Sequence, residues 1–289
     1  MTRTLIVGID TVAGHSLAQQ MTLHLARRSE VSGLWFSEPE FIKGCRTARV
    51  SSKSLSKELP LADIIVFCGG AARSSWDAEF GDFSREQQWL NECIAATGDT
   101  GAKLVLISSD AVFSGPWVFH DDNSTALADD RNAKTLLKYE SLVRQVPNSL
   151  IVRTNVLGTT PGSLVADSVA AIRKGHQLTA DATTFATPID AESFAVALAS
   201  CIDHGVSGDL NIAGAERVTP FHFLLALANQ LNLNINQIQS ALKGGTSSEH
   251  SMRCNRLRNE YHLSAPLKWI VLEHLALAFQ EPLNHRVAA

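Results

Sequence analysis

The chain has 289 residues, 45% of them hydrophobic and 19% charged, which is enough to bury a full core as one large domain with a smaller one attached. Its formal net charge of -4 and its scattered Lys and Arg residues form no basic stripe, which argues against a nucleic-acid partner. The N-terminal apolar run stops at Gly8 and Asp10, too short for a signal segment or a membrane span, so we expect a cytoplasmic protein.

Five short apolar runs alternate with helical patterns in the first half of the chain. The runs are 4–9, 31–37, 63–69, 103–109 and 149–155, and segments such as 14–28 and 84–97 show apolar residues at helical spacing. Strands that alternate with helices indicate βαβ units and a parallel sheet covered on both faces. The predicted fold class is therefore α/β, a doubly wound parallel sheet of the Rossmann type over residues 1–155.

Helical patterns dominate the rest of the chain, residues 156–289. They cover 163–174, 190–203, 220–231 and 265–280, with short extended pieces near 176–180 and 208–213. This pattern predicts a smaller, mainly helical lobe, from which segments such as 179–195 return to the first domain. The segment 243–251 is the best candidate for a mobile loop. Five separated cysteines without a CxxC pair favour reduced thiols over disulfides or a metal site.

The first strand ends in a glycine turn that opens a helix. Gly8, Thr11, Val12 and Gly14 form this turn, and a nucleotide-binding turn needs glycine where the backbone bends and where it approaches a pyrophosphate. Thr11 stands in the middle position of the motif, where a Cβ crowds a phosphate. The turn alone fits either a dinucleotide site or a plain strand-to-helix connection.

Two further strand ends carry residues that suit a dinucleotide. Glu38 lies near the end of the second strand, where an acid can accept hydrogen bonds from an adenosine ribose, or it is a solvated loop carboxylate. Glu38 disfavours a ribose phosphate, whereas Arg46 and Arg49 leave the opposite preference open. The third apolar run ends in small residues that let a ligand approach the backbone: Gly69, Gly70 and Ala71.

The stretch "LISSDAVFSG" at 106–115 is the most specific in the chain. Serine hydroxyls at a strand end, such as those of Ser108 and Ser109, can donate to and accept from a substrate carbonyl. Serines at strand ends also cap helices and turns. The whole string, more than either serine, points to a ligand site.

With "NAKTLLKYE" at 132–140 and "SLIVRTNVLG" at 149–158, this stretch resembles the extended short-chain dehydrogenase/reductases, and within them the dTDP-4-dehydrorhamnose reductase branch. The resemblance continues through 185–202, 207–231 and 251–263. It implies a nucleotide-sugar reductase or epimerase-like protein that binds NAD or NADP, with Ser108 and Arg153 in the cofactor site and Ser109 holding the substrate carbonyl.

The same resemblance exposes a missing catalytic pair. The family uses a Tyr as proton donor and a Lys four residues later that lowers the tyrosine pKa. When Glu140 is placed on the family's Glu, Asn132 occupies the Tyr position and Leu136 the Lys position. When Lys138 is placed on the Lys, Lys134 falls on the Tyr position. The sequence contains no Tyr-x-x-x-Lys, so we expect ketone reduction by the family route to be absent or very slow.

His120 and Asp121, in a "HDD" loop that the family uses near its substrate, are candidates for a relocated acid, or they belong to a solvated polar loop. Three functions remain open: an enzyme rebuilt around Ser109, a non-catalytic subunit that binds a dinucleotide or nucleotide sugar, and a descendant that binds no nucleotide. A precedent for the second is the regulatory beta subunit of methionine adenosyltransferase, which is similar to the same branch. The helices at 84–97 and 134–146 are candidates for a homodimer or protein-partner contact.

Overall fold

The computed structural model of the chain describes residues 2–25, 29–77, 83–125, 127–159, 162–242 and 247–280. The strands are β1 Thr2–Val7, β2 Ser29–Trp35, β3 Arg46–Arg49, β4 Ile64–Phe67, β5 Lys103–Ser109, β6 Leu150–Thr154, β7 Val156–Leu157, β8 Leu178–Asp181, β9 Thr184–Phe185, β10 Ile189–Asp190, β11 Gly208–Ile212, β12 Ile238–Ala241 and β13 Ser248–Glu249. The α-helices are α1 Val12–Leu25, α2 Ser52–Glu58, α3 Ser84–Thr100, α4 Arg131–Val143, α5 Leu164–Arg173, α6 Ala191–Asp203, α7 Pro220–Gln230, α8 Asn255–Tyr261 and α9 Lys268–Gln280. Short 3-10 helices cover Leu59–Leu61, Asp110–Val112 and Ile235–Gln237.

Seven parallel strands form the central sheet, in the order β11-β6-β5-β4-β1-β2-β3. Helices join β1 to β2 (α1), β4 to β5 (α3) and β5 to β6 (α4), as parallel pairing requires, whereas residues 36–45 join β2 to β3 without a helix. Residues of both parities along these strands are buried, because both faces of the sheet are covered. The predicted doubly wound parallel sheet with a smaller, mainly helical lobe is thereby confirmed.

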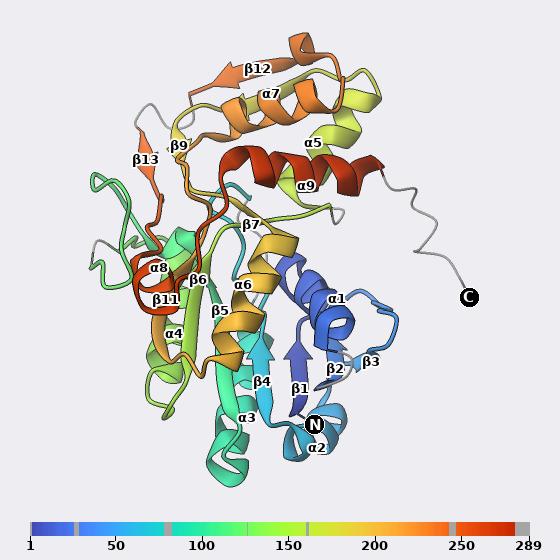
Figure 1. Ribbon diagram of the computed structural model, residues 1–289, viewed down its shortest axis with the longest axis vertical. Helices are drawn as coiled ribbons and strands as arrows, with labels where there is room; N and C mark the ends of the chain where they lie inside the picture. The colour runs from blue at the N-terminus through green and yellow to red at the C-terminus, as the bar shows by residue number, and fades with distance from the viewer. Residues whose placement is uncertain are drawn as a thin grey trace.

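Each face of the sheet packs on its own set of helices. Ile6, Val66 and Val152 point to the face that α1 and α6 cover, through side chains such as Leu17 and Phe194. On the opposite face, the neighbouring strand positions pack against α2, α3 and α4 through Leu55, Leu90, Leu136, Tyr139 and Val143. Figure 1 shows these two helical layers on either side of the strands.

The smaller lobe lies beyond the carboxyl ends of the strands, where α5, α7 and α9 pack together (Figure 1). Val169 of α5, Phe223 and Leu227 of α7 and Leu275 of α9 share one apolar cluster. Two-stranded parallel ladders, β12 with β8 and β13 with β9, complete this lobe. None of the described helices is both long and apolar enough to span a bilayer.

One predicted piece belongs to a different part of the molecule. The sequence places 208–213 in the smaller lobe, whereas Gly208–Ile212 is β11, the edge strand that pairs with β6 of the central sheet. The adjoining helix α6 packs on α1. Without β11, β6 would be an exposed edge of the sheet. The strand from the second half of the chain pairs with that edge and covers it. Residues 243–246 of the predicted mobile loop lie outside the described residues.

Candidate functional site

The candidate site lies at the carboxyl edge of the central sheet. β1 stands between β2 and β4, so the strand order reverses there. In doubly wound sheets the connections on either side of such a reversal diverge and leave a crevice for ligands. The segments after β1, β2, β4 and β5 all reach this edge, and the smaller lobe stands opposite it (Figure 1).

The glycine turn after β1 is so close-packed that Gly8 and Gly14 have no room for a side chain. Gly8 has φ +95°, and a Cβ there would lie 2.0 Å from the carbonyl oxygen of Cys68. A Cβ on Gly14 would lie 2.1 Å from the carbonyl oxygen of Gly8. Thr11 Oγ1 donates to that same carbonyl at 2.8 Å and accepts from Gly14 N–H at 3.1 Å. Thr11 thus caps the helix that Val12 begins, and a phosphate-binding role for these four residues stays a prediction.

Asp10, inside this turn, holds the segment that follows β2. Its Oδ1 accepts the N–H of Phe36 at 2.9 Å, and its Oδ2 accepts those of Ser37 at 2.8 Å and Glu38 at 3.2 Å. The Glu38 side chain itself is exposed. The sequence analysis missed Asp10, although a charged residue between the glycines of the turn is a signal that was open to it.

Glu86 of α3 fills the space beside the glycines that follow β4. Its carboxylate accepts Gly70 N–H at 2.7 Å and Ala71 N–H at 3.3 Å. A Cβ on either Gly69 or Gly70 would lie 2.8 Å from a Glu86 oxygen. Burial, with a smaller contribution from Asp10, raises the pKa of Glu86 to about 7. The small residues here accommodate a half-buried acid, which nothing in the helical pattern of the sequence indicated.

Ser109 ends β5 with its hydroxyl fully buried. That hydroxyl donates to the carbonyl of Arg73 and accepts from Ala111 N–H at 3.0 Å. Its oxygen also lies 3.1 Å from Asp110 Oδ1. A hydroxyl so committed has no free donor for a substrate carbonyl unless the loop after β4 moves.

Asp110, which follows β5, accepts hydrogen bonds from residues that follow β4 and β6. It accepts Ser75 N–H at 2.9 Å, Ser75 Oγ–H at 2.6 Å and an Asn155 amide hydrogen at 2.6 Å. Burial raises the pKa of Asp110, and nearby His250 opposes that rise. The cluster ties the loops after β4, β5 and β6 together and covers Ser109.

Helix α4 carries Asn132 and Leu136, at the positions that the sequence resemblance assigns to the catalytic pair. Leu136 and Tyr139 are buried in the apolar cluster on that face of the sheet, and the Tyr139 hydroxyl donates to Phe83 O at 3.0 Å. Asn132 is half-buried at the start of the helix. Lys134 and Lys138 are exposed, and Lys138 donates to Gln87 at 2.9 Å.

Ser108 and Arg153, both predicted to contact a cofactor, belong to one buried ionic network. Glu140 of α4 accepts Ser108 Oγ–H at 2.8 Å, Arg153 Nε–H at 3.0 Å and Arg153 Nη2–H at 2.7 Å. Arg153 also pairs with Asp209 at 3.0 Å. Since Ser108 and Arg153 are register partners on β5 and β6, they point to the face opposite that of Ser109.

A sequence profile of the RmlD substrate-binding domain family matches residues 88–265, more than half of the chain. The chain belongs to this family. A comparison with curated proteins gives no significant match.

Solved structures show the same fold at low identity. A hypothetical dTDP-4-dehydrorhamnose reductase from Sulfolobus tokodaii is 20% identical, with 91% of this chain and 96% of that chain covered and a TM-score of 0.71. The dTDP-4-dehydrorhamnose reductase of Bacillus anthracis, in complex with NADP, is 17% identical, with 96% and 98% covered and a TM-score of 0.73. The dTDP-glucose 4,6-dehydratase DesIV of Streptomyces venezuelae, with NAD bound, is 15% identical, with 98% of both chains covered and a TM-score of 0.79.

In this RmlD-family chain the "HDD" loop serves mainly as an anchor. His120 is buried, stacks on Phe113 with ring centroids 4.6 Å apart, and hydrogen-bonds Ser124 through Nδ1 at 2.9 Å. Burial lowers the pKa of His120, which disfavours a protonated imidazole. Asp122 accepts Asn211 N–H at 2.7 Å, and Asp121 is exposed.

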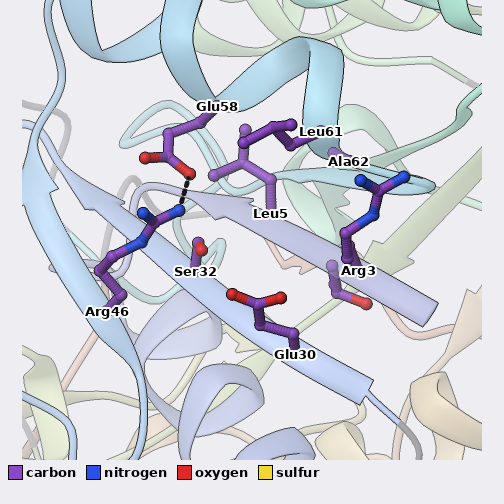
Figure 2. A pocket seen from close by; sticks show the side chains of 9 residues that line it. Arg3, Leu5, Glu30, Ser32, Arg46, Glu58, Leu61 and Ala62 are labelled. Carbon is purple, nitrogen blue, oxygen red and sulfur yellow. Dashed lines mark hydrogen bonds and ion pairs between the residues drawn. The ribbon is translucent and has the colours of Figure 1, made fainter. Parts of the chain in front are cut away.

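A cavity of about 200 Å³ opens away from this edge, near the amino ends of β1 and β2. Figure 2 shows Arg46 paired with Glu58 on one side of it, with Arg3 and Glu30 on the other sides. Its position on the amino-terminal side of the sheet separates it from the candidate site at the carboxyl edge. The described part of the chain holds no group of three or more His, Cys, Asp and Glu residues suited to a metal ion.

Proposed function

We propose that this RmlD-family protein binds a dinucleotide at the carboxyl edge of its sheet and does not reduce ketones by the Ser–Tyr–Lys route. It acts as a ligand-binding relative of the nucleotide-sugar reductases. The division into a sheet domain and a smaller lobe, with the crevice between the two parts, belongs to the same proposal, and β11 and α6 of the second half are counted in the sheet domain.

The hydrogen bonds of the buried Ser109 hydroxyl are the main support for the proposed loss of ketone reduction. Its hydroxyl is buried and bonded to Arg73 O and Ala111 N–H. Leu136 stands fully buried where a lysine would tune the proton donor. With the hydroxyl covered and the ammonium replaced by a core side chain, the ketone has neither its anchor nor its acid, and general acid catalysis is worth about 100- to 10,000-fold in rate.

Three features support dinucleotide binding. The turn from Gly8 to Gly14 brings the N-terminus of α1 to the strand reversal, where backbone N–H groups and the helix dipole favour a pyrophosphate. Asp10 places a carboxylate beside the segment after β2, where an adenosine ribose sits in such folds. The reductase of Bacillus anthracis and DesIV are complexed with NADP and NAD.

Side chains of this protein would set the environment of a bound dinucleotide. A bound nicotinamide would supply the hydride for reduction. The cluster of Ser75, Asp110 and Asn155 excludes water from Ser109 and holds its hydroxyl away from a substrate. Glu86, with its pKa raised to about 7, retains its proton in much of the population at neutral pH and so limits the repulsion of a pyrophosphate.

Calorimetric titration of the purified chain with NADH and NADPH tests the proposal. We expect binding at micromolar strength to at least one nucleotide, and no loss of reduced-cofactor absorbance when dTDP- and UDP-4-keto sugars are added. Cofactor consumption above that of a heat-inactivated control would overturn the loss of reduction. Ser109→Ala then shows whether that serine takes part. Absence of binding to both nucleotides would favour a descendant without a nucleotide site.

A further inference from the structure

Three consecutive backbone N–H groups converge on one carboxylate at the carboxyl edge of the sheet. Phe36 donates to Asp10 Oδ1, and Ser37 and Glu38 donate to Oδ2, at 2.9, 2.8 and 3.2 Å. Asp10 is half-buried. Each carboxylate oxygen has two acceptor sites, so Oδ1 retains room for one further hydrogen bond.

The position of the Asp10 carboxylate suits contact with the adenosine ribose of a dinucleotide. Asp10 follows β1 and its donors follow β2, and the two strands are neighbours in register from Thr2 with Ser29 to Val7 with Leu34. Gly8 N–H and Ile9 N–H both donate to Leu34 O, at 2.6 and 3.0 Å, which fixes the turn against the end of β2. In doubly wound dinucleotide sites the groups at the end of the second strand meet the adenosine ribose and discriminate between a 2′-hydroxyl and a 2′-phosphate.

Charge at this point favours the hydroxyl. Backbone N–H groups and arginines are the usual partners of a phosphate, and here Asp10 already occupies the three N–H groups. Of the two arginines near β2, Arg46 pairs with Glu58 at 2.5 Å on the amino side of the sheet (Figure 2), and Arg49, beside Trp35 at the end of β2, has its guanidinium 5.7 Å from the centroid of the Trp35 ring. A 2′-phosphate would meet a carboxylate where it needs a donor.

We propose that Asp10 is the specificity-determining residue of the crevice and selects an adenine dinucleotide with a free ribose 2′-hydroxyl over its 2′-phosphorylated form. The free acceptor site on Oδ1 takes the hydroxyl hydrogen. The negative charge repels the phosphate. This inference rests on the proposed function, because it concerns the ligand of that same site, and it assigns to Asp10 the role that the sequence suggested for Glu38.

Binding of NADH and NADPH to the wild-type protein and to two variants tests it. In Asp10→Asn, an isosteric amide removes the charge and keeps an acceptor for the backbone. Glu38→Gln removes a neighbouring exposed charge as a matched control. We expect wild-type protein to bind NADH on the order of tenfold more tightly than NADPH, Asp10→Asn to narrow that ratio by a similar factor through tighter NADPH binding, and Glu38→Gln to leave it unchanged.

The outcomes separate the inference from the proposed function. Wild-type protein that binds NADPH as tightly as NADH overturns the role of Asp10, and this measurement needs no variant to fold. The role of Asp10 is also overturned if the ratio of NADH to NADPH affinity is the same in wild type and Asp10→Asn. An equal shift of this ratio in Glu38→Gln and Asp10→Asn overturns it as well. If neither nucleotide binds to wild type or variants, the proposed function fails and the inference fails with it. Far-ultraviolet circular dichroism of each variant checks that the fold is retained.

Discussion

Leu136 stands at the helix position that the sequence resemblance assigns to the catalytic lysine. A leucine at this position is fully buried among the apolar side chains that join α4 to the sheet. A lysine there would need a charged partner or solvent, because burial penalises an ammonium strongly. The surroundings of Leu136 are therefore those of a core position, and we expect that a lysine introduced there would not act in a catalytic pair.

Restoring the pair should accordingly fail. We expect Asn132→Tyr/Leu136→Lys to show no consumption of NADH with 4-keto sugars and to be roughly 3 kcal/mol or more less stable than wild type, because a lysine ammonium enters an apolar cluster. Urea unfolding and a cofactor absorbance assay measure the two effects. Asn132→Tyr alone serves as the control for the half-buried position. Restored turnover in the double variant would show that the site is intact apart from those two side chains.

Glu86 gives the protein a pH-dependent stability of predictable sign. Its pKa is raised from 4.5 to about 7, so on passing from pH 4.5 to 7 the unfolded chain loses this proton while the folded chain keeps it. Stability from this group therefore falls across that window, by about 3 kcal/mol, and stays at the lower level above it. We expect Glu86→Gln to lose less stability than wild type between pH 5 and pH 8 in urea unfolding. Glu92→Gln on the same helix is the control. Parallel pH profiles for wild type and Glu86→Gln would contradict the assignment.

At the scale of elements, a buried ionic network fixes α4 against β5, β6 and β11. Glu140 is fully buried and receives hydrogen bonds from Ser108 and Arg153, and Arg153 extends the network to Asp209. Arg144 reaches the same carboxylate from the surface at 3.2 Å. The contacts of Ser108 and Arg153 join helix α4 to the sheet, and the cofactor role that the sequence resemblance gave them stays a prediction.

The two arginines of this network should differ in importance. We expect Arg153→Met to destabilise the protein by about 3–5 kcal/mol, because it leaves the Glu140 carboxylate buried without its bidentate partner. Arg144→Met should cost no more than about 1 kcal/mol, since half of that side chain is in solvent. Urea unfolding of both variants gives the comparison. Equal losses would show that Arg153 is not the main partner of Glu140.

At the scale of the whole molecule, the first sheet is completed by the second half of the chain. β11 pairs with β6, and α6 covers the same face as α1 through Phe194, Leu198 and Cys201. A division of the chain at residue 155 therefore separates the central sheet from its edge strand β11. It also separates α1 from α6, the helix that covers the same face of the sheet.

This arrangement predicts the behaviour of fragments. We expect a fragment of residues 1–155 to lack cooperative unfolding, because the apolar face that α6 covers is left in water. The fragment 1–213 restores α6 and β11 and serves as the comparison. Thermal unfolding followed by circular dichroism distinguishes them. A cooperative transition in 1–155 at the temperature of the longer fragment would show that α6 and β11 add nothing to the first domain.

The sequence by itself determined the fold class, the five strands β1, β2, β4, β5 and β6 and the long helices, because continuous apolar runs and helical spacing are local signals that survive in the fold. It also determined that no tyrosine precedes a lysine by four residues. The short strand β3 and the short helix α2 were not predicted, since residues 46–58 are mostly exposed and polar. Only the tertiary structure decided that 208–212 joins the central sheet, that Asp10 binds the segment after β2, and that Glu86 lies against Gly70. Those contacts join residues far apart in the chain, and side-chain direction and burial, which set them, are properties of the packed molecule rather than of any single stretch.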